Sequence, residues 1–110
     1  MITPTELRTY RFHPQGLDPV TVYVEQYTAK ASRIIVQCYA QAWTAYWGNY
    51  GGGSVEEFIC NCHPEYIASN LNWGLNGLML KRVEKHQYAY LLRIAAAVKE
   101  HFLSLQGNKS

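Results

Sequence analysis

The sequence predicts an α+β fold in which a three-stranded antiparallel sheet is followed by two or three helices packed on one face of that sheet. Two patterns lead to this expectation. Apolar and polar residues alternate through residues 7–47, as in half-buried strands, whereas apolar residues recur at helical spacing through residues 54–105. The chain has 110 residues and 48% of them are hydrophobic, so we expect one domain with one core over residues 1–110.

The first two strands are marked by alternation and by the turn residues that end them. The first covers residues 7–13 and stops at the proline and glycine of residues 14–16. The second covers residues 20–27, and a short polar link at residues 28–32 leads directly to the third strand, which predicts an antiparallel hairpin. Three alternate valines form the expected core face of the second strand: Val20, Val22 and Val24.

The third strand is predicted over residues 33–47 and has two unlike faces. One face is small and apolar, and it consists of Ile34, Val36, Cys38, Ala40 and Ala42. The opposite face carries amides and large aromatic rings, namely Gln37, Tyr39, Gln41, Trp43 and Trp47. Residues 40–47 contain several alanines and also suit a helix, so the second half of this strand has two interpretations.

The helical half begins at Ser54, which has capping-box spacing to Glu57. Pro64 suits the first position of a further helix, and the asparagines and glycines of residues 72–77 predict a loop. The last helix is predicted over residues 81–105. An apolar stripe at i, i+3, i+4 and i+7 defines the buried side of the first helix: Val55, Phe58, Ile59 and Cys62.

Composition and charge exclude several classes of protein. The net charge is only +2, which by itself does not identify a nucleic-acid-binding protein. No apolar stretch has the length of a membrane span, and no signal-peptide pattern is present. The odd count of three cysteines argues against a disulfide framework. We therefore expect a protein of the reducing cytoplasm that does not contact a membrane.

Residues with catalytic or metal-binding chemistry are sparse. Cys60, Cys62 and His63 are potential metal ligands, but their CxC spacing differs from that of structural zinc sites, which favours a buried cysteine and a turn histidine instead. Asp18 is the only aspartate, and the glutamates form no catalytic pair. We therefore expect no enzyme activity, no catalytic residue, and no metal or other cofactor.

Large aromatic rings are costly to leave in water, so the aromatic strand face predicts a contact surface. The same rings also suit stacking on the bases of single-stranded DNA or RNA, with Lys30 and Arg33 contacting phosphate. A further alternative is that the helices cover this face and make its aromatics part of the core. Because Tyr and Trp are favoured anchors in protein interfaces, the predicted partner-binding residues are Tyr23, Tyr27, Tyr39, Trp43 and Trp47.

Several short segments together resemble small proteins encoded in the early or accessory regions of lambdoid phages and prophages of enteric bacteria. The resemblance covers about residues 10–75, and it is carried by residues 33–38, residues 43–47, Glu57-Phe58 and Tyr66-Ile67. It supplies no catalytic residue. It implies an accessory protein in the host cytoplasm that binds a host or phage protein, for example of the defence, recombination or restriction machinery, or that assists phage DNA metabolism.

Overall fold

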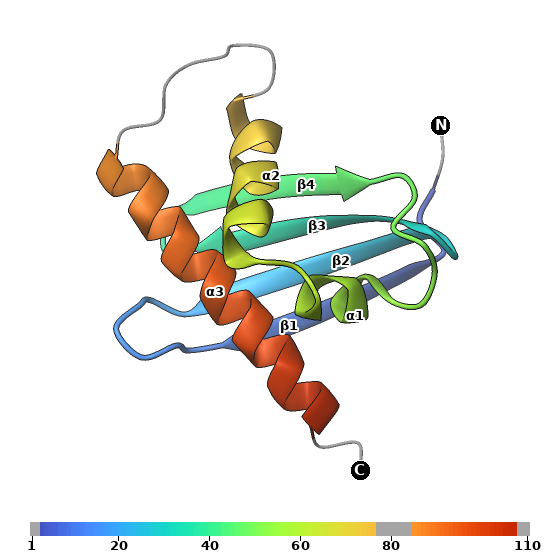
Figure 1. The fold of residues 1–110 in the computed structure, drawn as a ribbon, viewed down its shortest axis with the longest axis horizontal. Helices are drawn as coiled ribbons and strands as arrows, with labels where there is room; N and C mark the ends of the chain where they lie inside the picture. The colour runs from blue at the N-terminus through green and yellow to red at the C-terminus, as the bar shows by residue number, and fades with distance from the viewer. Residues whose placement is uncertain (1–2, 77–84, 108–110) are drawn as a thin grey trace.

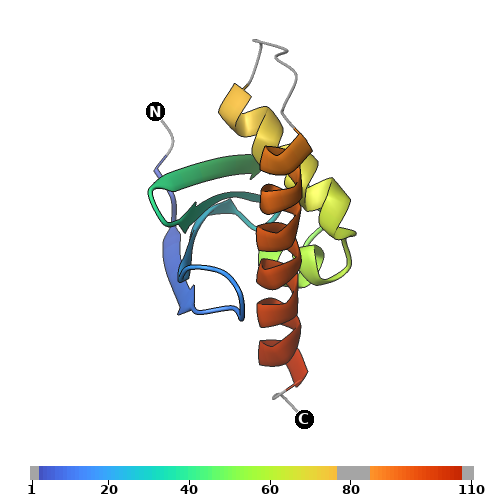
Figure 2. The ribbon, with the colours of Figure 1, turned by 90° about the vertical axis from the view of Figure 1, so that its left-hand side faces the viewer.

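The structure is a computed structural model that describes residues 3–76 and 85–107. Within these residues, four strands form one antiparallel sheet in chain order, and three helices follow. All the helices lie on the same side of the sheet (Figure 1; Figure 2). The α+β class predicted from the sequence is confirmed. The elements are β1 (Glu6–Phe12), β2 (Val20–Thr28), β3 (Ala31–Cys38), β4 (Gln41–Trp47), α1 (Val55–Cys60), α2 (Pro64–Asn76) and α3 (Lys85–Gly107).

The prediction of three strands is wrong, because residues 33–47 do not form one strand. The chain reverses at Tyr39 and Ala40, and the two halves pair with each other as β3 and β4. Tyr39 has a φ of 58°, the left-handed conformation that tight hairpin turns require and that Gly, Asn or Asp usually supply. The helical alternative for residues 40–47 is also wrong, since β4 is a paired strand. The predicted hairpin of β2 and β3 is confirmed.

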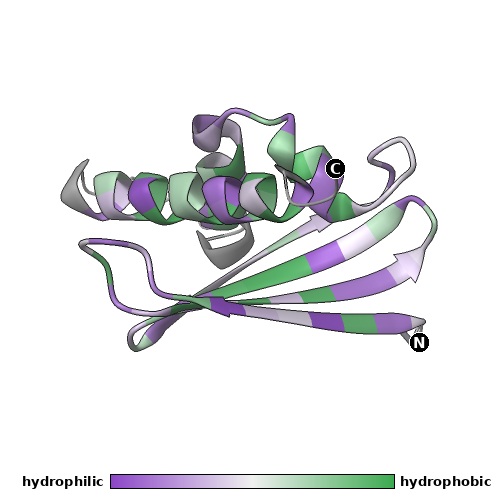
Figure 3. Cartoon of the chain, turned by 90° about the horizontal axis from the view of Figure 1, so that it is seen from below, coloured by the Kyte–Doolittle hydropathy of each residue, from purple (hydrophilic) through white to green (hydrophobic). Residues whose placement is uncertain are grey.

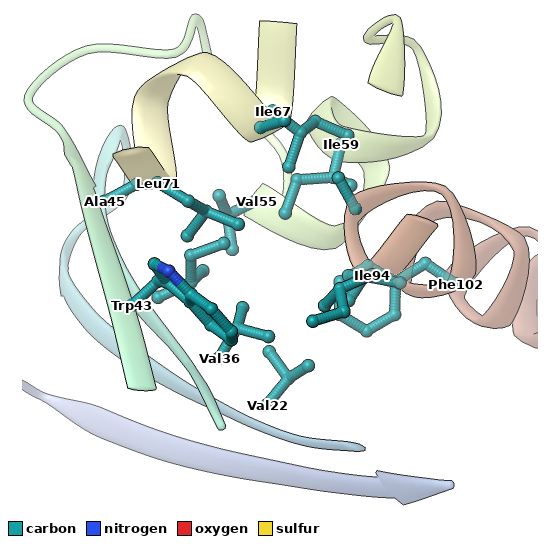
Figure 4. Close-up of a cluster of buried hydrophobic side chains, with 14 of the residues drawn as sticks. Val22, Val36, Trp43, Ala45, Val55, Ile59, Ile67, Leu71, Ile94 and Phe102 are labelled. Atoms are coloured by element: carbon teal, nitrogen blue, oxygen red, sulfur yellow. The ribbon is translucent and has the colours of Figure 1, made fainter. Parts of the chain in front are cut away.

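We call the side of the sheet that the helices cover the inner face, and the opposite side the outer face (Figure 3). The inner face of β2 carries the predicted valines, which are completely buried. In the register of the sheet, Val22 lies opposite Val36, and Val36 in turn lies opposite Trp43. The β3–β4 hairpin therefore brings an indole onto the same face as the valines, where it becomes part of the hydrophobic core (Figure 4).

The helix starts follow from local sequence. The Ser54 hydroxyl accepts a hydrogen bond from the Glu57 backbone N–H, and the Glu57 carboxylate accepts one from the Ser54 N–H, so the predicted capping box is confirmed. Pro64 opens α2 as predicted. Val55 and Ile59 are completely buried, whereas Phe58 and Cys62 of the same predicted stripe are only partly covered.

The prediction of a loop at residues 72–77 is wrong for residues 72–76, because α2 continues to Asn76. The helix as a whole packs against β4 and α3, and tertiary packing of this kind overrides the weak helix propensity of asparagine and glycine. The predicted last helix is confirmed from Lys85 onward, and residues 81–84 lie outside the described residues. The side chains of α3 that enter the core are spaced at helical intervals: Leu91, Ile94, Val98 and Phe102.

Candidate binding surface on the outer face of the sheet

The outer face is built by the residues that alternate with the buried ones on each strand. None of the helices within the described residues covers it (Figure 2; Figure 3). Cross-strand pairing aligns its side chains in three rows across the sheet. These rows are Leu7, Glu25, Arg33 and Tyr46; Thr9, Tyr23, Ile35 and Thr44; and Arg11, Thr21, Gln37 and Ala42.

Four side chains at one end of this face hold one another in place. Arg33 Nη1 lies 3.8 Å from Glu25 Oε1, and the Tyr27 hydroxyl donates a hydrogen bond of 2.9 Å to the same carboxylate oxygen. The Arg33 guanidinium also lies 6.0 Å from the centre of the Tyr46 ring, at the limit of a cation–π contact. The Tyr27 and Tyr46 rings meet edge to face at 6.1 Å. The hydrogen bond to Glu25 raises the pKa of Tyr27.

Apolar groups on this face remain accessible to a partner. Leu7 is 68% exposed and Tyr46 is 54% exposed, and Tyr23 lies partly open between them in the sheet. Among the described strand residues, Glu25 is the only carboxylate that alternation places on the outer face, and it is paired with Arg33, whereas Arg11 is exposed. The outer face therefore combines aromatic and aliphatic surface with a small excess of positive charge.

Trp43 and Trp47 do not lie on this face, so their predicted place beside the tyrosines is wrong. They are only 6% and 8% exposed, and both project from the inner face into the core. The reason is the reversal at Tyr39 and Ala40: because β4 runs back beside β3, its odd-numbered residues lie opposite the even-numbered core residues of β3. The Trp47 indole N–H donates a hydrogen bond of 3.0 Å to the hydroxyl of Tyr66.

The other predicted partner-binding residues occupy different parts of the surface. Tyr23 and Tyr27 lie on the outer face, and Tyr39 is exposed at the tip of the β3–β4 turn. Lys30 is exposed in the β2–β3 turn, and Arg33 lies on the outer face. That these residues bind a partner or phosphate stays a prediction.

Sequence reasoning missed Leu7 and Tyr46. Leu7 was already inside a predicted strand, and its place on the outer face follows from its pairing with Glu25. The prediction of one long strand over residues 33–47 placed the even-numbered residues after position 40 on the core face. It therefore did not identify Tyr46 as a surface residue. A turn signature between residues 38 and 41 would have revealed it, but neither Tyr39 nor Ala40 supplies one.

A second polar cluster lies on the inner side, at the edge formed by β1. Arg8 makes a bidentate contact with Glu56, with its Nε 2.6 Å from Oε2 and its Nη2 2.9 Å from Oε1. The Tyr10 hydroxyl donates a hydrogen bond of 2.5 Å to Glu56 Oε2. This cluster joins the edge strand to α1, and it lines a pocket of about 490 Å³ with Phe102 and Leu105 of α3.

The charges of this cluster are mutually stabilised. Burial alone would raise the pKa of Glu56, but the hydrogen bonds from Arg8 and Tyr10 outweigh it, and the net pKa of this carboxyl is lowered. The same contacts raise the pKa of Arg8, and burial together with the bond to Glu56 raises the pKa of Tyr10 to about 12. Glu56 is therefore a charged, fully partnered side chain at neutral pH, which is the behaviour of a structural ion pair.

The cysteines are placed as small core or near-core residues. Cys60 is buried at the end of α1, and the Cys62 thiol donates to the Phe58 carbonyl oxygen at 3.2 Å. Burial raises the pKa of both thiols, which keeps them protonated at neutral pH. In residues 3–76 and 85–107, no three His, Cys, Asp or Glu side chains gather where they could hold a metal ion.

The glycine-rich segment before α1 is anchored at one point. Tyr50 is buried, and its hydroxyl accepts a hydrogen bond of 2.6 Å from the Gln26 side chain. Residues 51–53 then run through positive φ values, which only glycine adopts without strain, and they remain exposed. The segment thus connects β4 to α1 on the inner side and does not extend the outer face.

Comparison with known proteins identifies a family. The family model Phage_phiTE_072, described as a phage family, matches residues 1–77. The chain belongs to this phage family. The match confirms the resemblance to small phage proteins, and it covers every strand of the sheet together with α1 and α2. The attribution to lambdoid phages stays a prediction.

No curated protein and no solved structure matched the chain. The helices of this phage family member, in residues 3–76 and 85–107, include none with the length and apolar character needed to cross a membrane.

Proposed function

We propose that this protein is a non-enzymatic phage accessory protein that acts in the host cytoplasm by binding a protein of the host or of the phage through the outer face of its sheet. The partner that we favour belongs to the host defence, recombination or restriction machinery. The observation that carries this proposal is the uncovered outer face, where Leu7, Tyr23 and Tyr46 are exposed around an ordered arginine.

The composition of this surface supports binding to another protein. Tyr and Arg are enriched at the energetic centres of protein interfaces, because tyrosine rings bury a large area with little loss of side-chain entropy and guanidinium groups form several hydrogen bonds at once. Arg33 is already restrained by Glu25 and the Tyr46 ring, so it loses less freedom on binding than an unrestrained side chain would. The slight excess of positive charge favours a partner whose contact surface carries acidic residues.

The test makes the same change, leucine to serine, at two positions on opposite sides of the molecule. Leu7 on the outer face and Leu103 on α3 are 68% and 42% exposed, so changing either to serine removes an exposed apolar side chain with little effect on stability. The wild-type protein is used to capture partners from host cells, and each captured protein is then purified and its affinity measured directly. We expect Leu7→Ser and Tyr46→Ser to weaken binding about ten-fold or more, which corresponds to about 1.4 kcal/mol.

Leu103→Ser serves as the matched control and should leave the affinity unchanged. If Leu103→Ser weakens binding and Leu7→Ser does not, the interface lies on the helical side. That outcome would contradict the proposal. Far-UV circular dichroism of all three variants separates a lost contact from a lost fold.

A second candidate function is binding of single-stranded DNA or RNA by the same face. The observation that favours it is the combination of tyrosine rings with Arg11 and Arg33 on an antiparallel sheet whose outward carboxylate is already paired. Because Trp43 and Trp47 are buried, the fluorescence of these two indoles does not report on this surface. The fluorescence anisotropy of a labelled oligonucleotide, measured at about 50 and about 200 mM salt, detects binding to this surface. An affinity that falls steeply with salt would support this function.

A further inference from the structure

The loop that joins β1 to β2 lies beside α3 (Figure 2). A groove of about 570 Å³ lies between them, apart from the outer face. Its volume is in the range of small-molecule sites in proteins. The loop contributes His13, Pro14, Gln15 and Leu17, and the end of β1 contributes Phe12. The helix contributes its side at residues 93–101.

The groove is held open by two features. Arg93 Nη2 donates a hydrogen bond of 2.9 Å to the carbonyl oxygen of Gly16, which ties the tip of the loop to the helix. Gly16 has a φ of +81°, and a Cβ at this position would lie 3.3 Å from that same nitrogen, so the close approach suits glycine. Next to Arg93 on this side of the helix, Ala96 and Ala97 end at their Cβ atoms and leave the space between loop and helix unfilled.

The lining combines apolar walls with polar side chains and a cation. Phe12 and His101 stack in parallel at 4.1 Å between ring centres, and together with Leu17 they form the apolar walls. Burial lowers the pKa of His101, so this ring is uncharged at neutral pH. Arg93 therefore supplies the positive charge of the lining, and its guanidinium retains N–H donors beyond the one used by Gly16.

Glu100 limits the charge of any ligand. It lies seven residues after Arg93, about 10.5 Å further along the helix axis, and it also lines the groove. A carboxylate here repels an anion that carries more than one charge, such as a phosphate dianion. A single negative charge placed near Arg93 is repelled less strongly, and a carboxylate matches the planar geometry with which guanidinium groups bind.

We propose that this groove binds a small apolar monocarboxylate, whose carboxylate pairs with Arg93 and whose hydrocarbon or aromatic body lies on Ala96 and Ala97. An aromatic acid of the size of phenylacetate fits this description, with its ring packed between the Phe12–His101 stack and Leu17. The site is independent of the outer face, so it stands or falls separately from the proposed protein interface.

The test titrates the wild-type protein with three probes of nearly equal shape: phenylacetate, neutral phenylacetamide and cationic phenethylamine. The methyl signals of Ala96 and Ala97 are followed by NMR. We expect saturable shifts with phenylacetate and an affinity about ten-fold or more weaker for the other two probes. Absence of saturable shifts with phenylacetate, or equal affinity for phenylacetamide, would overturn the proposal.

One variant locates the site without disturbing the loop anchor. Ala97→Leu fills the groove but leaves the hydrogen bond from Arg93 to Gly16 intact, so it should abolish phenylacetate binding while the protein remains folded by circular dichroism. Unchanged binding by Ala97→Leu would place the probe elsewhere and refute the groove as its site. Arg93→Lys keeps the charge but not the planar pair of donors, and we expect it to retain part of the affinity.

Discussion

The ion pair between Arg8 and Glu56 offers the sharpest test of how the edge strand is attached to the helical layer. The perturbation is Glu56→Gln, which keeps the shape of the side chain and an acceptor for the Tyr10 hydroxyl but removes the charge. Arg8 then keeps its contact with Glu6, in which its Nη1 lies 3.2 Å from Oε1, and the hydrogen bond of 3.0 Å that its Nη2 donates to Gln26 Oε1. The variant therefore leaves a partly buried guanidinium without its main partner.

The magnitude follows from burial. Breaking a fully buried ion pair by removing one partner costs about 3–5 kcal/mol, whereas an exposed pair contributes about 0–1 kcal/mol. The side chains of Arg8 and Glu56 are 23% and 12% exposed, which places this pair between the two limits. We expect Glu56→Gln to lower the free energy of unfolding by about 2 kcal/mol. Urea denaturation then shows a midpoint about 1 M lower, for an m-value of about 2 kcal/mol/M.

The same pair predicts a pH dependence with a defined sign. Contacts with Arg8 and Tyr10 lower the pKa of Glu56 in the folded protein. Its contribution to stability is therefore fully present above the pKa of an unfolded glutamate, about 4.3, and it is lost as the pH falls through the folded pKa. The difference between wild type and Glu56→Gln should be largest near pH 7 and should shrink below about pH 4.3.

Glu6→Gln is the matched control, because it removes the other carboxylate that contacts Arg8. The Glu6 side chain is 59% exposed, so we expect a change within about 0.5 kcal/mol. The reasoning that burial makes one pair strong and the other weak is refuted if the two variants lose equal free energy of unfolding. It is also refuted if the loss for Glu56→Gln does not vary between pH 7 and pH 3.

Three further predictions concern the core, the hairpin and the thiols. Trp43→Ala should cost about 3–5 kcal/mol in urea denaturation, whereas Tyr46→Ala on the outer face should cost less than about 1 kcal/mol; similar costs would mean that Trp43 is not core. Tyr39→Asn should raise the unfolding free energy by about 0.5 kcal/mol, since asparagine tolerates the positive φ at this turn better than tyrosine, and a decrease would contradict the turn geometry. Cys60 and Cys62 should react with iodoacetamide more slowly at pH 7 than a free thiol does, because burial raises the pKa of both, and fast alkylation of the native protein would argue against it.

Much of the fold could be predicted because local signals and tertiary packing agree. The alternating valines of β2, the Ser54 capping box and the Pro64 helix start each have one physical interpretation, and each is found in the structure. The end of α2 could not be predicted in this way. Its asparagines and glycine favour a loop locally, whereas α2 as a whole packs against β4 and α3, and these contacts between segments distant in sequence are not visible in the local pattern.

The candidate surface could be predicted only in part, and the reason is a single turn. Tyr23 and Tyr27 are assigned to the outer face by alternation within β2, whose register is fixed by the valines. For β4, alternation gives two faces but does not say which one is buried. That choice depends on where the chain reverses, and a shift of one residue exchanges the faces. With Tyr39 in a position normally held by glycine or asparagine, the reversal left no signal in the sequence.

The limited helical layer explains why aromatic side chains end up on both sides of the sheet. Within the described residues all the helices pack on one face, and the indoles of Trp43 and Trp47 are buried in the core between that layer and the sheet. Figure 4 shows Trp43 among these core side chains. Because no helix among them covers the other face, Tyr23 and Tyr46 stay in contact with solvent there at an energetic cost. Serine or threonine at these positions would keep the strands and avoid that cost. Contact with the partner proposed above would cover the tyrosines that lie around Arg33, so the comparison of Leu7→Ser with Leu103→Ser tests whether these rings serve binding or only the sheet.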